Sequence, residues 1–241
     1  EVVLYEKESK LGGLVNLASS LPRLYTRELH NIVDWLSNQL GQLSVKVELG
    51  KEATLEVVEE IQPDAVIVAT GSSAEIPNIP GIKSPSVMTL DDYLREGQAG
   101  QKVAVLGAAY GSETAISLAR EGKEVTILEQ GGEEMVIAAP YIDIMRMPVI
   151  PRYIQEEKIT LLTGVEVVAI DGTKVRYRNA QGAEKEIDAD TVILATGRRS
   201  NQELVAALKG KVSEVYPIGD CVEPRRIFTA VHDGSYFARE L

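Results

Sequence analysis

The sequence predicts an α/β fold built from two three-layer domains, one of which is inserted into the other. Two observations lead to this prediction. Short apolar runs alternate with stretches of helical periodicity, which is typical of a parallel sheet covered by helices. One of these runs also occurs twice, as VIVATG at Val66–Gly71 and as VILATG at Val192–Gly197, about 125 residues apart. Such strands are common singly, but two copies indicate two similar units.

The first part of the chain alternates between strands and helices. The run EVVLYE predicts a strand over Glu1–Glu6, and apolar residues at helical spacing predict a helix over Pro22–Leu40. Pro and Gly residues mark 74–85 as a connecting segment. The other predicted elements before it are a strand at Ser44–Leu49, a helix at Thr54–Ile61 and a buried strand at Asp64–Ala69.

A second unit begins after the connecting segment. Residues 160–195 look like several antiparallel strands, with a hairpin around the turn Asn179–Gly182. The predicted elements are strand Lys102–Leu106, loop Gly107–Gly111, helix Ser112–Glu121, strand Glu124–Glu129, the hairpin strands Lys174–Arg178 and Glu184–Ile187, and strand Thr191–Ala195.

Residues 102–129 have the order of a Rossmann unit, in which a dinucleotide pyrophosphate lies at a helix N-terminus and an acid binds a ribose hydroxyl. Glu129 is that acid, 22 positions after Gly107. The loop departs from the pattern, because Ala109 replaces the second glycine and Gly111 comes one residue early. A working NAD site and a fold that binds weakly or not at all both remain open. If the site works, Glu129 without an adjacent Arg favours NAD over NADP.

Glu6 is the matching acid of the first unit, and Gly12 and Gly13 follow it. The alternative for Glu6 is an exposed acid at a strand end. Before it we expect a strand, a glycine loop and a helix, about 25–30 residues in an ordinary βαβ unit. We therefore predict that the first nucleotide-binding domain is incomplete at its N-terminus.

Composition excludes several classes of protein. The net charge of −11 argues against nucleic acid or an anionic membrane as the partner, and no apolar run approaches the ~20 residues of a membrane helix. The single cysteine, Cys221, fits a reducing cytoplasm and rules out an iron–sulfur cluster built from this chain alone. From the sequence we predict no metal-binding residues.

The motifs and their order resemble the paired FAD- and NAD(P)-binding domains of flavoprotein disulfide-reductase-like enzymes. More narrowly, the chain is similar to the C-terminal region of the NADH:flavin oxidoreductases related to 2,4-dienoyl-CoA reductase and trimethylamine dehydrogenase. The resemblance rests on Glu6 with Gly12-Gly13, VIVATG, IPGI at 79–82, KVAVLG with Glu129, VILATG, and YPIGDC at 216–221 followed by Arg225-Arg226 and His232-Asp233-Gly234.

The resemblance implies an FAD- or ADP-binding domain at 1–85 and 211–241 and an NAD(P)-binding domain at 86–210, both Rossmann-like. It implies that Asp220 binds the ribityl or phosphate side of FAD; the alternative is that Asp220 caps the following segment. Together the motifs predict a cofactor site at Glu6, Gly12, Gly13, Ala69, Thr70, Gly71, Gly107, Ala109, Gly111, Glu129, Ala195, Thr196, Gly197, Gly219 and Asp220.

The implied function is hydride transfer from NAD(P)H to FAD, with no catalytic side chain, because the cofactors carry the chemistry. An N-terminal barrel with FMN and an iron–sulfur cluster, outside this chain, would then reduce a small-molecule substrate. We expect this chain alone to be inactive and to retain little FAD. The alternative is a non-catalytic scaffold that holds ADP or no ligand.

Overall fold

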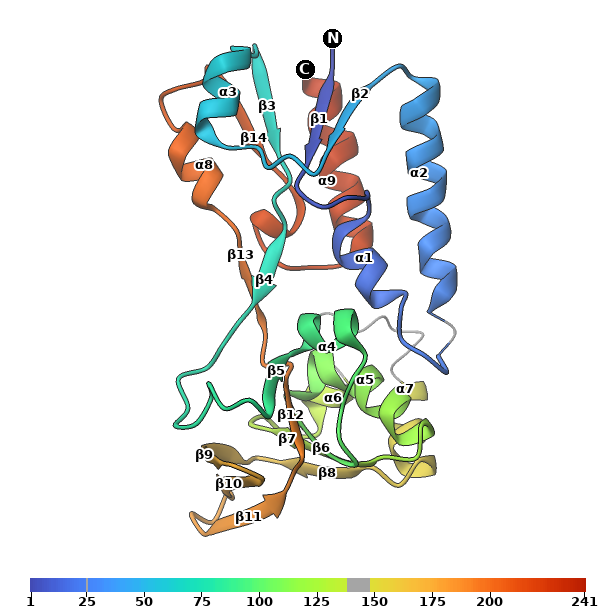
Figure 1. Ribbon diagram of the computed structural model, residues 1–241, viewed down its shortest axis with the longest axis vertical. Helices are drawn as coiled ribbons and strands as arrows, with labels where there is room; N and C mark the ends of the chain where they lie inside the picture. Colours follow the sequence, from blue (N-terminus) through green and yellow to red (C-terminus); the bar gives the residue numbers. More distant parts are fainter. Residues whose placement is uncertain (25, 138–147) are drawn as a thin grey trace. The chain divides into compact units, whose positions relative to one another are not determined.

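The computed structural model of the protein describes residues 1–24, 26–137 and 148–241, which form two compact units. Unit 1 comprises residues 1–19, 26–73 and 198–241, and unit 2 comprises residues 20–25 and 74–197. In Figure 1, the cyan and red parts of the chain and most of the blue part belong to unit 1, and the green and yellow parts belong to unit 2. The predicted α/β fold is confirmed, whereas the ligand-binding domain boundaries stay a prediction.

Unit 2 is built on a five-stranded sheet in the order β5-β12-β6-β7-β8, in which all neighbouring strands are parallel. Helix α4 begins after Thr89, whose hydroxyl accepts the Asp92 N–H while the Asp92 carboxylate accepts the Thr89 N–H. The elements of the sheet and its helices are β5 (Val87–Thr89), α4 (Leu90–Glu96), β6 (Lys102–Leu106), α5 (Ala108–Arg120), β7 (Glu124–Glu129), α6 (Glu134–Ile137), α7 (Val149–Glu156), β8 (Thr160–Thr163) and β12 (Thr191–Leu194).

The two faces of this sheet are covered differently, which gives three layers (Figure 1). Val103 and Val105 of β6 pack in a buried cluster with residues of α4, α5 and α7. Their neighbours Ala104 and Leu106 point to the other face, into a cluster with β9 (Glu166–Asp171) and β10 (Lys174–Arg178). Tyr93 of α4 lies in the first cluster, where burial raises the pKa of its hydroxyl to about 12.

The outer layer of unit 2 is the antiparallel sheet β11-β10-β9, with β11 at Glu184–Asp188. The predicted hairpin is confirmed, and the Asn179 side chain accepts N–H groups from Gln181 and Ala183 in its turn. The prediction that 160–195 is antiparallel is wrong at both ends. Strands β8 and β12 belong to the parallel sheet. The prediction failed because the residue pattern of a strand fits parallel and antiparallel pairing alike.

Unit 1 contains two parallel strand pairs, β1 with β2 and β14 with β3. A small core of Val58, Val68, Leu208 and Cys221 joins β3 to the helices around it. The elements are β1 (Val3–Glu6), α1 (Gly13–Ala18), η1 (Arg27–Leu29), α2 (His30–Gln42), β2 (Lys46–Leu49), α3 (Leu55–Ile61), β3 (Ala65–Val68), β4 (Ser72–Ala74), β13 (Arg198–Ser200), α8 (Glu203–Leu208), β14 (Glu214–Pro217), η2 (Gly219–Cys221) and α9 (Ile227–Glu240).

Two predicted helices begin elsewhere. The helix expected from Pro22 starts at His30, after the turn η1. The helix expected from Ser112 starts at Ala108. Gly107, with φ of 98°, lets the chain pass from strand β6 into the helix within one residue. Within the described ranges, no helix combines the length and the apolar character needed to cross a bilayer.

The outer sheet of unit 2 generates a pH-dependent contribution to stability. Hydrogen bonds from Lys174 and Lys102 hold the pKa of the exposed Asp188 carboxyl below its ordinary value. A depressed pKa stabilises the fold above the unfolded-state pKa, about 3.9, and this stabilisation is lost as the pH falls through the folded-state pKa. We expect Asp188→Asn to flatten the dependence of the urea midpoint on pH between about 5 and 3. The difference from the parent protein should shrink at ~1 M salt; parallel pH curves at low salt would contradict the prediction.

Candidate functional site

In unit 2, two glycines allow helix α5 to approach the parallel sheet closely. A Cβ atom on Gly107 would lie 2.3 Å from the carbonyl oxygen of Ala195, and one on Gly111 would lie 2.4 Å from Val105 Cγ1 and 3.0 Å from Ala195 Cβ. Neither position accommodates a side chain without a shift of its surroundings. Gly111 therefore has the helix-packing role of the last glycine in a Rossmann loop, although it comes one residue early.

Glu129, at the carboxyl end of β7, contacts the start of α5. Its Oε2 accepts the N–H of Ala108 at 2.7 Å, and its Oε1 accepts the N–H of Gly131 at 2.7 Å. The residue is 7% exposed. The carboxylate therefore lies at a helix N-terminus, where the backbone N–H groups and the helix dipole favour negative charge.

The altered loop changes the phosphate end of this arrangement. Because α5 begins at Ala108, Ala109 lies in its first turn rather than in a free loop. A Rossmann loop binds pyrophosphate through backbone N–H groups at this place. Here the first of them is already bonded to Glu129, and Ala109 adds a methyl group beside the next. Compared with a Rossmann unit, the strand-end acid is kept, whereas the first backbone N–H of the helix is already bonded.

Glu6 in unit 1 repeats the local geometry of Glu129. It ends β1, and its Oε1 accepts the N–H of Glu8, two residues further on, at 2.8 Å. Glu129 accepts the N–H of Gly131 across the same separation. Glu6 is half-buried, so it is not the freely exposed acid of the alternative interpretation.

Gly12 and Gly13 turn the chain into α1 with φ angles of 114° and 45°. A Cβ atom on Gly12 would lie 2.7 Å from Asn16 Oδ1 and 2.8 Å from Val33 Cγ1. Asn16 donates through Nδ2 to the Leu11 carbonyl, and its buried Oδ1 has no hydrogen-bond partner among the described residues. A crowded glycine turn with an unpaired acceptor close to Glu6 in the chain is compatible with a nucleotide at this end of the strand.

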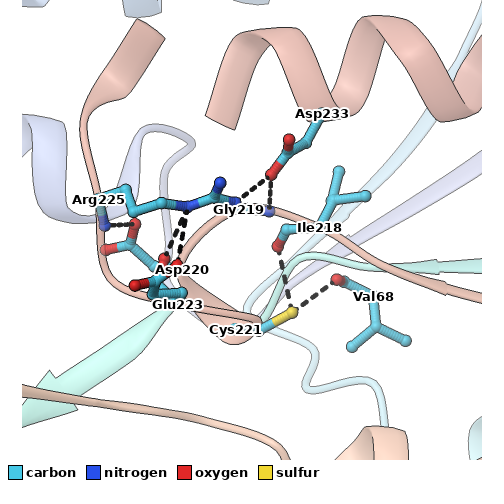
Figure 2. A network of polar contacts seen from close by, with 8 residues as sticks. All are labelled: Val68, Ile218, Gly219, Asp220, Cys221, Glu223, Arg225 and Asp233. Carbon is cyan, nitrogen blue, oxygen red and sulfur yellow. Dashed lines mark hydrogen bonds and ion pairs between the residues drawn. The ribbon is translucent and has the colours of Figure 1, made fainter. Parts of the chain in front are cut away.

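The Gly219–Asp220 turn of η2 is fixed by helix α9 and by the segment that follows it (Figure 2). Asp233 Oδ2 accepts the N–H of Gly219 at 3.1 Å and pairs with Arg225 Nη2 at 2.7 Å. Asp220 Oδ1 accepts the backbone N–H of Arg225 at 3.1 Å, which ties the turn to the loop before α9, whereas α9 itself has no side-chain cap. Cys221 is buried and donates to carbonyl oxygens of Val68 and Ile218.

The two Ala-Thr-Gly sequences make the same hydrogen bonds, each within its own unit. Thr70 Oγ1 donates to the carbonyl of Asn201 at 2.7 Å, and the Asn201 N–H donates to Gly71. In unit 2, Thr196 Oγ1 donates to the carbonyl of Glu75 at 2.9 Å, and the Glu75 N–H donates to Gly197. Asn201 and Glu75 each stand four positions after the glycine of the other copy.

The structure thus brings the predicted residues together in two groups. One group contains Gly107, Gly111, Glu129 and Ala195 in unit 2. The other contains Gly219 and Asp220 of unit 1, beside the strand β4 that follows Ala69–Gly71.

Sequence reasoning gave no role to Ser72 and Arg198, which complete the second group. Ser72 Oγ donates to Asp220 Oδ2 at 3.1 Å, and Arg198 Nε donates to Ser72 Oγ at 2.8 Å. The available signal was position, since each of them directly follows one Ala-Thr-Gly copy.

Comparison with known proteins matches residues 8–234 to the family described as pyridine nucleotide-disulphide oxidoreductase. The whole chain is 37% identical to bilirubin reductase of Mediterraneibacter gnavus and 28% identical to cinnamate reductase of Clostridium sporogenes, and it covers 37% and 36% of these proteins. The structure of a 2-naphthoyl-CoA reductase matches 97% of this chain with a TM-score of 0.87 and 31% identity, over 35% of its own length. Histamine dehydrogenase from Rhizobium sp. 4-9, at 23% identity and a TM-score of 0.82, shares the fold.

The close approach at Gly107 predicts a large effect of one methyl group. We expect Gly107→Ala to destabilise unit 2 by about 2–4 kcal/mol, because the new Cβ meets a backbone carbonyl and the residue has a positive φ. The matched control is Gly122→Ala, where φ is 87° and the space is open. That change should cost only about 1 kcal/mol. Urea unfolding measures both, and equal losses would show that the contact with Ala195 is unimportant.

Proposed function

The chain belongs to the pyridine nucleotide-disulphide oxidoreductase family, and we propose that it binds NADH and FAD and serves as the hydride-transfer part of a larger redox enzyme. The resemblance to flavin oxidoreductases of the dienoyl-CoA reductase and trimethylamine dehydrogenase type is confirmed by the family match and the likeness to 2-naphthoyl-CoA reductase. This family supports binding of a flavin and a nicotinamide nucleotide. The particular cofactors, their residues and the direction of transfer are our proposal.

The observation that carries the proposal is the repeated strand-end glutamate. Glu6 and Glu129 end parallel strands, and both accept a backbone N–H two residues further on. This contact fixes the rotamer of the carboxylate before any ligand arrives. Each carboxylate oxygen keeps lone pairs that can accept a ribose hydroxyl. Two such acids, one in each unit, support two adenine dinucleotides per chain.

In unit 1, the residues proposed to hold FAD are Glu6 at the adenosine ribose, Gly12 and Gly13 beside it, and Gly219 with Asp220 at the ribityl side. In unit 2, Gly107, Gly111 and Glu129 would hold NADH. When bound, the cofactors supply the chemistry, in which a hydride leaves NADH to give NAD⁺ and reduces FAD by two electrons. The side chains of this part of the enzyme orient the cofactors and exclude water.

We propose NADH rather than NADPH as the donor. Glu129 places a carboxylate where a 2′-phosphate would lie. Between positions 124 and 137 the sequence has no Lys or Arg to balance a phosphate. Repulsion between two anions therefore disfavours NADPH.

This chain spans 35–38% of the 2-naphthoyl-CoA reductase and histamine dehydrogenase chains, which supports further domains in the whole enzyme. We infer an N-terminal domain with FMN and an iron–sulfur cluster, to which the reduced FAD passes electrons. The bilirubin, cinnamate and 2-naphthoyl-CoA reductases are named for small organic molecules, which supports a substrate of that class.

One observation favours a second candidate, a scaffold that holds ADP in unit 1 and does not react with NADH. The Ala108 N–H at the phosphate end of unit 2 is occupied by Glu129, and Ala109 replaces a glycine. Both changes weaken pyrophosphate binding. In a scaffold, unit 2 would retain its fold without its ligand.

Anaerobic titration of the whole enzyme with NADH separates the two candidates. We expect NADH to bleach flavin absorbance beyond that of any FMN, and nucleotide released by denaturation to contain FAD. A colourless unit 1 that releases ADP, together with absorbance that NADH leaves unchanged, would identify the scaffold instead.

The choice of dinucleotide depends on Glu129. We expect Glu129→Gln to raise the dissociation constant for NADH about tenfold, since a hydrogen bond to a charged group contributes about 1.5–3 kcal/mol. The preference for NADH over NADPH should narrow, because the repelling charge is gone. Glu133→Gln, an exposed acid four positions on, is the matched control and should change neither value. Unchanged NADH affinity in Glu129→Gln would contradict a ribose contact.

A further inference from the structure

We propose that Ser72 and Arg198 are positioning residues that hold the Asp220 carboxylate in the orientation in which it binds FAD. This inference rests on the proposed function, because it gives Asp220 a contact with the flavin nucleotide. It adds two residues outside the predicted site, both from the strands β4 and β13, which pair with each other in a two-stranded sheet.

The chemistry of the three groups fixes the direction of every hydrogen bond. A guanidinium only donates, so Ser72 Oγ must accept from Arg198 Nε at 2.8 Å. The single hydroxyl proton of Ser72 is then free to point at Asp220 Oδ2, 3.1 Å away. Arg198 Nη2 also donates to the Ser72 carbonyl at 2.9 Å, which holds the guanidinium against the same residue. The result is a polarised chain from a cation through a hydroxyl to an anion.

Burial strengthens this chain. Ser72 is 9% exposed, so water competes little for its hydroxyl. Hydrogen bonds in series polarise one another in such surroundings.

Asp220 is held on both of its oxygens, from different directions. Oδ1 accepts the backbone N–H of Arg225, and the guanidinium of Arg225 pairs with Asp233 on α9 (Figure 2). Oδ2 accepts from Ser72. The contact to Oδ1 comes from the same loop and moves with it, whereas the contact to Oδ2 comes from a residue 148 positions away. Ser72 therefore fixes the plane of the carboxylate relative to the paired strands β4 and β13.

A neighbouring serine provides a matched control. Ser73 also lies on β4, but its hydroxyl bonds to the side chain of Asn201. Removing the Ser73 hydroxyl therefore changes a polar contact of the same strand pair while leaving the bonds to Asp220 in place. If β4 had a purely structural role, removing either serine hydroxyl would have the same effect on FAD binding.

The experiment compares FAD binding in variants of the whole enzyme after its FAD has been stripped. Fluorescence titration gives the dissociation constant for FAD, spectroelectrochemistry gives the flavin potential, and thermal unfolding reports folding. We expect Ser72→Ala to raise the dissociation constant about tenfold and to shift the flavin potential. Ser72→Thr, which keeps the hydroxyl, and Ser73→Ala should match the parent enzyme. Arg198→Gln should weaken FAD binding in the same direction as Ser72→Ala.

Asp220→Asn separates the failure of this inference from that of the proposed function. If Asp220→Asn leaves FAD binding unchanged, Asp220 is not an FAD ligand and the proposed site is wrong. If it weakens binding and Ser72→Ala does not, the positioning role is overturned while the site stands. In the double variant Ser72→Ala/Asp220→Asn we expect no loss beyond that of Asp220→Asn alone, since Ser72 acts through Asp220. Additive losses, or equal effects of Ser72→Ala and Ser73→Ala, would overturn the inference.

Discussion

The close approach of helix α5 to the parallel sheet is the constraint on which the proposed dinucleotide site of unit 2 depends. It is possible because Gly107 and Gly111 have no side chains where Ala195 and Val105 lie against them. The approach brings the first N–H of α5 to the Glu129 carboxylate at the end of the neighbouring strand. A helix start, a buried acid and two strand ends are thereby placed together without any ligand.

The internal repeat extends from sequence into hydrogen bonding. Each Ala-Thr-Gly threonine donates to the carbonyl four positions beyond the other copy's glycine, and each of those residues returns an N–H to a glycine carbonyl. The repeat is broken at the next position, where one copy has Ser72 and the other has Arg198. Arg198 donates to Ser72, and Ser72 in turn donates to Asp220, so the difference between the copies creates a contact that two identical copies would lack.

Local patterns in the sequence predicted most of the strands along the chain, the strand-end acids and the glycine turns, because these features depend on near neighbours along the chain. They did not show that α5 begins at Ala108, since a loop shortened by one residue leaves the helical pattern of Ser112 and beyond unchanged. They also did not show the role of Ser72, whose partners Arg198 and Asp220 lie 126 and 148 positions away. Contacts across such distances arise from the packing of strands, and the sequence marks these residues only by their position after each Ala-Thr-Gly copy.

The Glu129 carboxylate makes a shortened loop compatible with a dinucleotide site. A carboxylate has about four lone-pair positions, and Glu129 uses two of them on Ala108 and Gly131. The others can accept ribose hydroxyls while the backbone contacts persist, so the acid is ordered before binding and loses little entropy when the ligand arrives. The replacement at Ala109 affects the contact with the pyrophosphate. NADH and NADPH share this group, so the replacement weakens the binding of both alike. In the proposed site, affinity is thus reduced at the phosphate end, while selectivity is kept at the ribose.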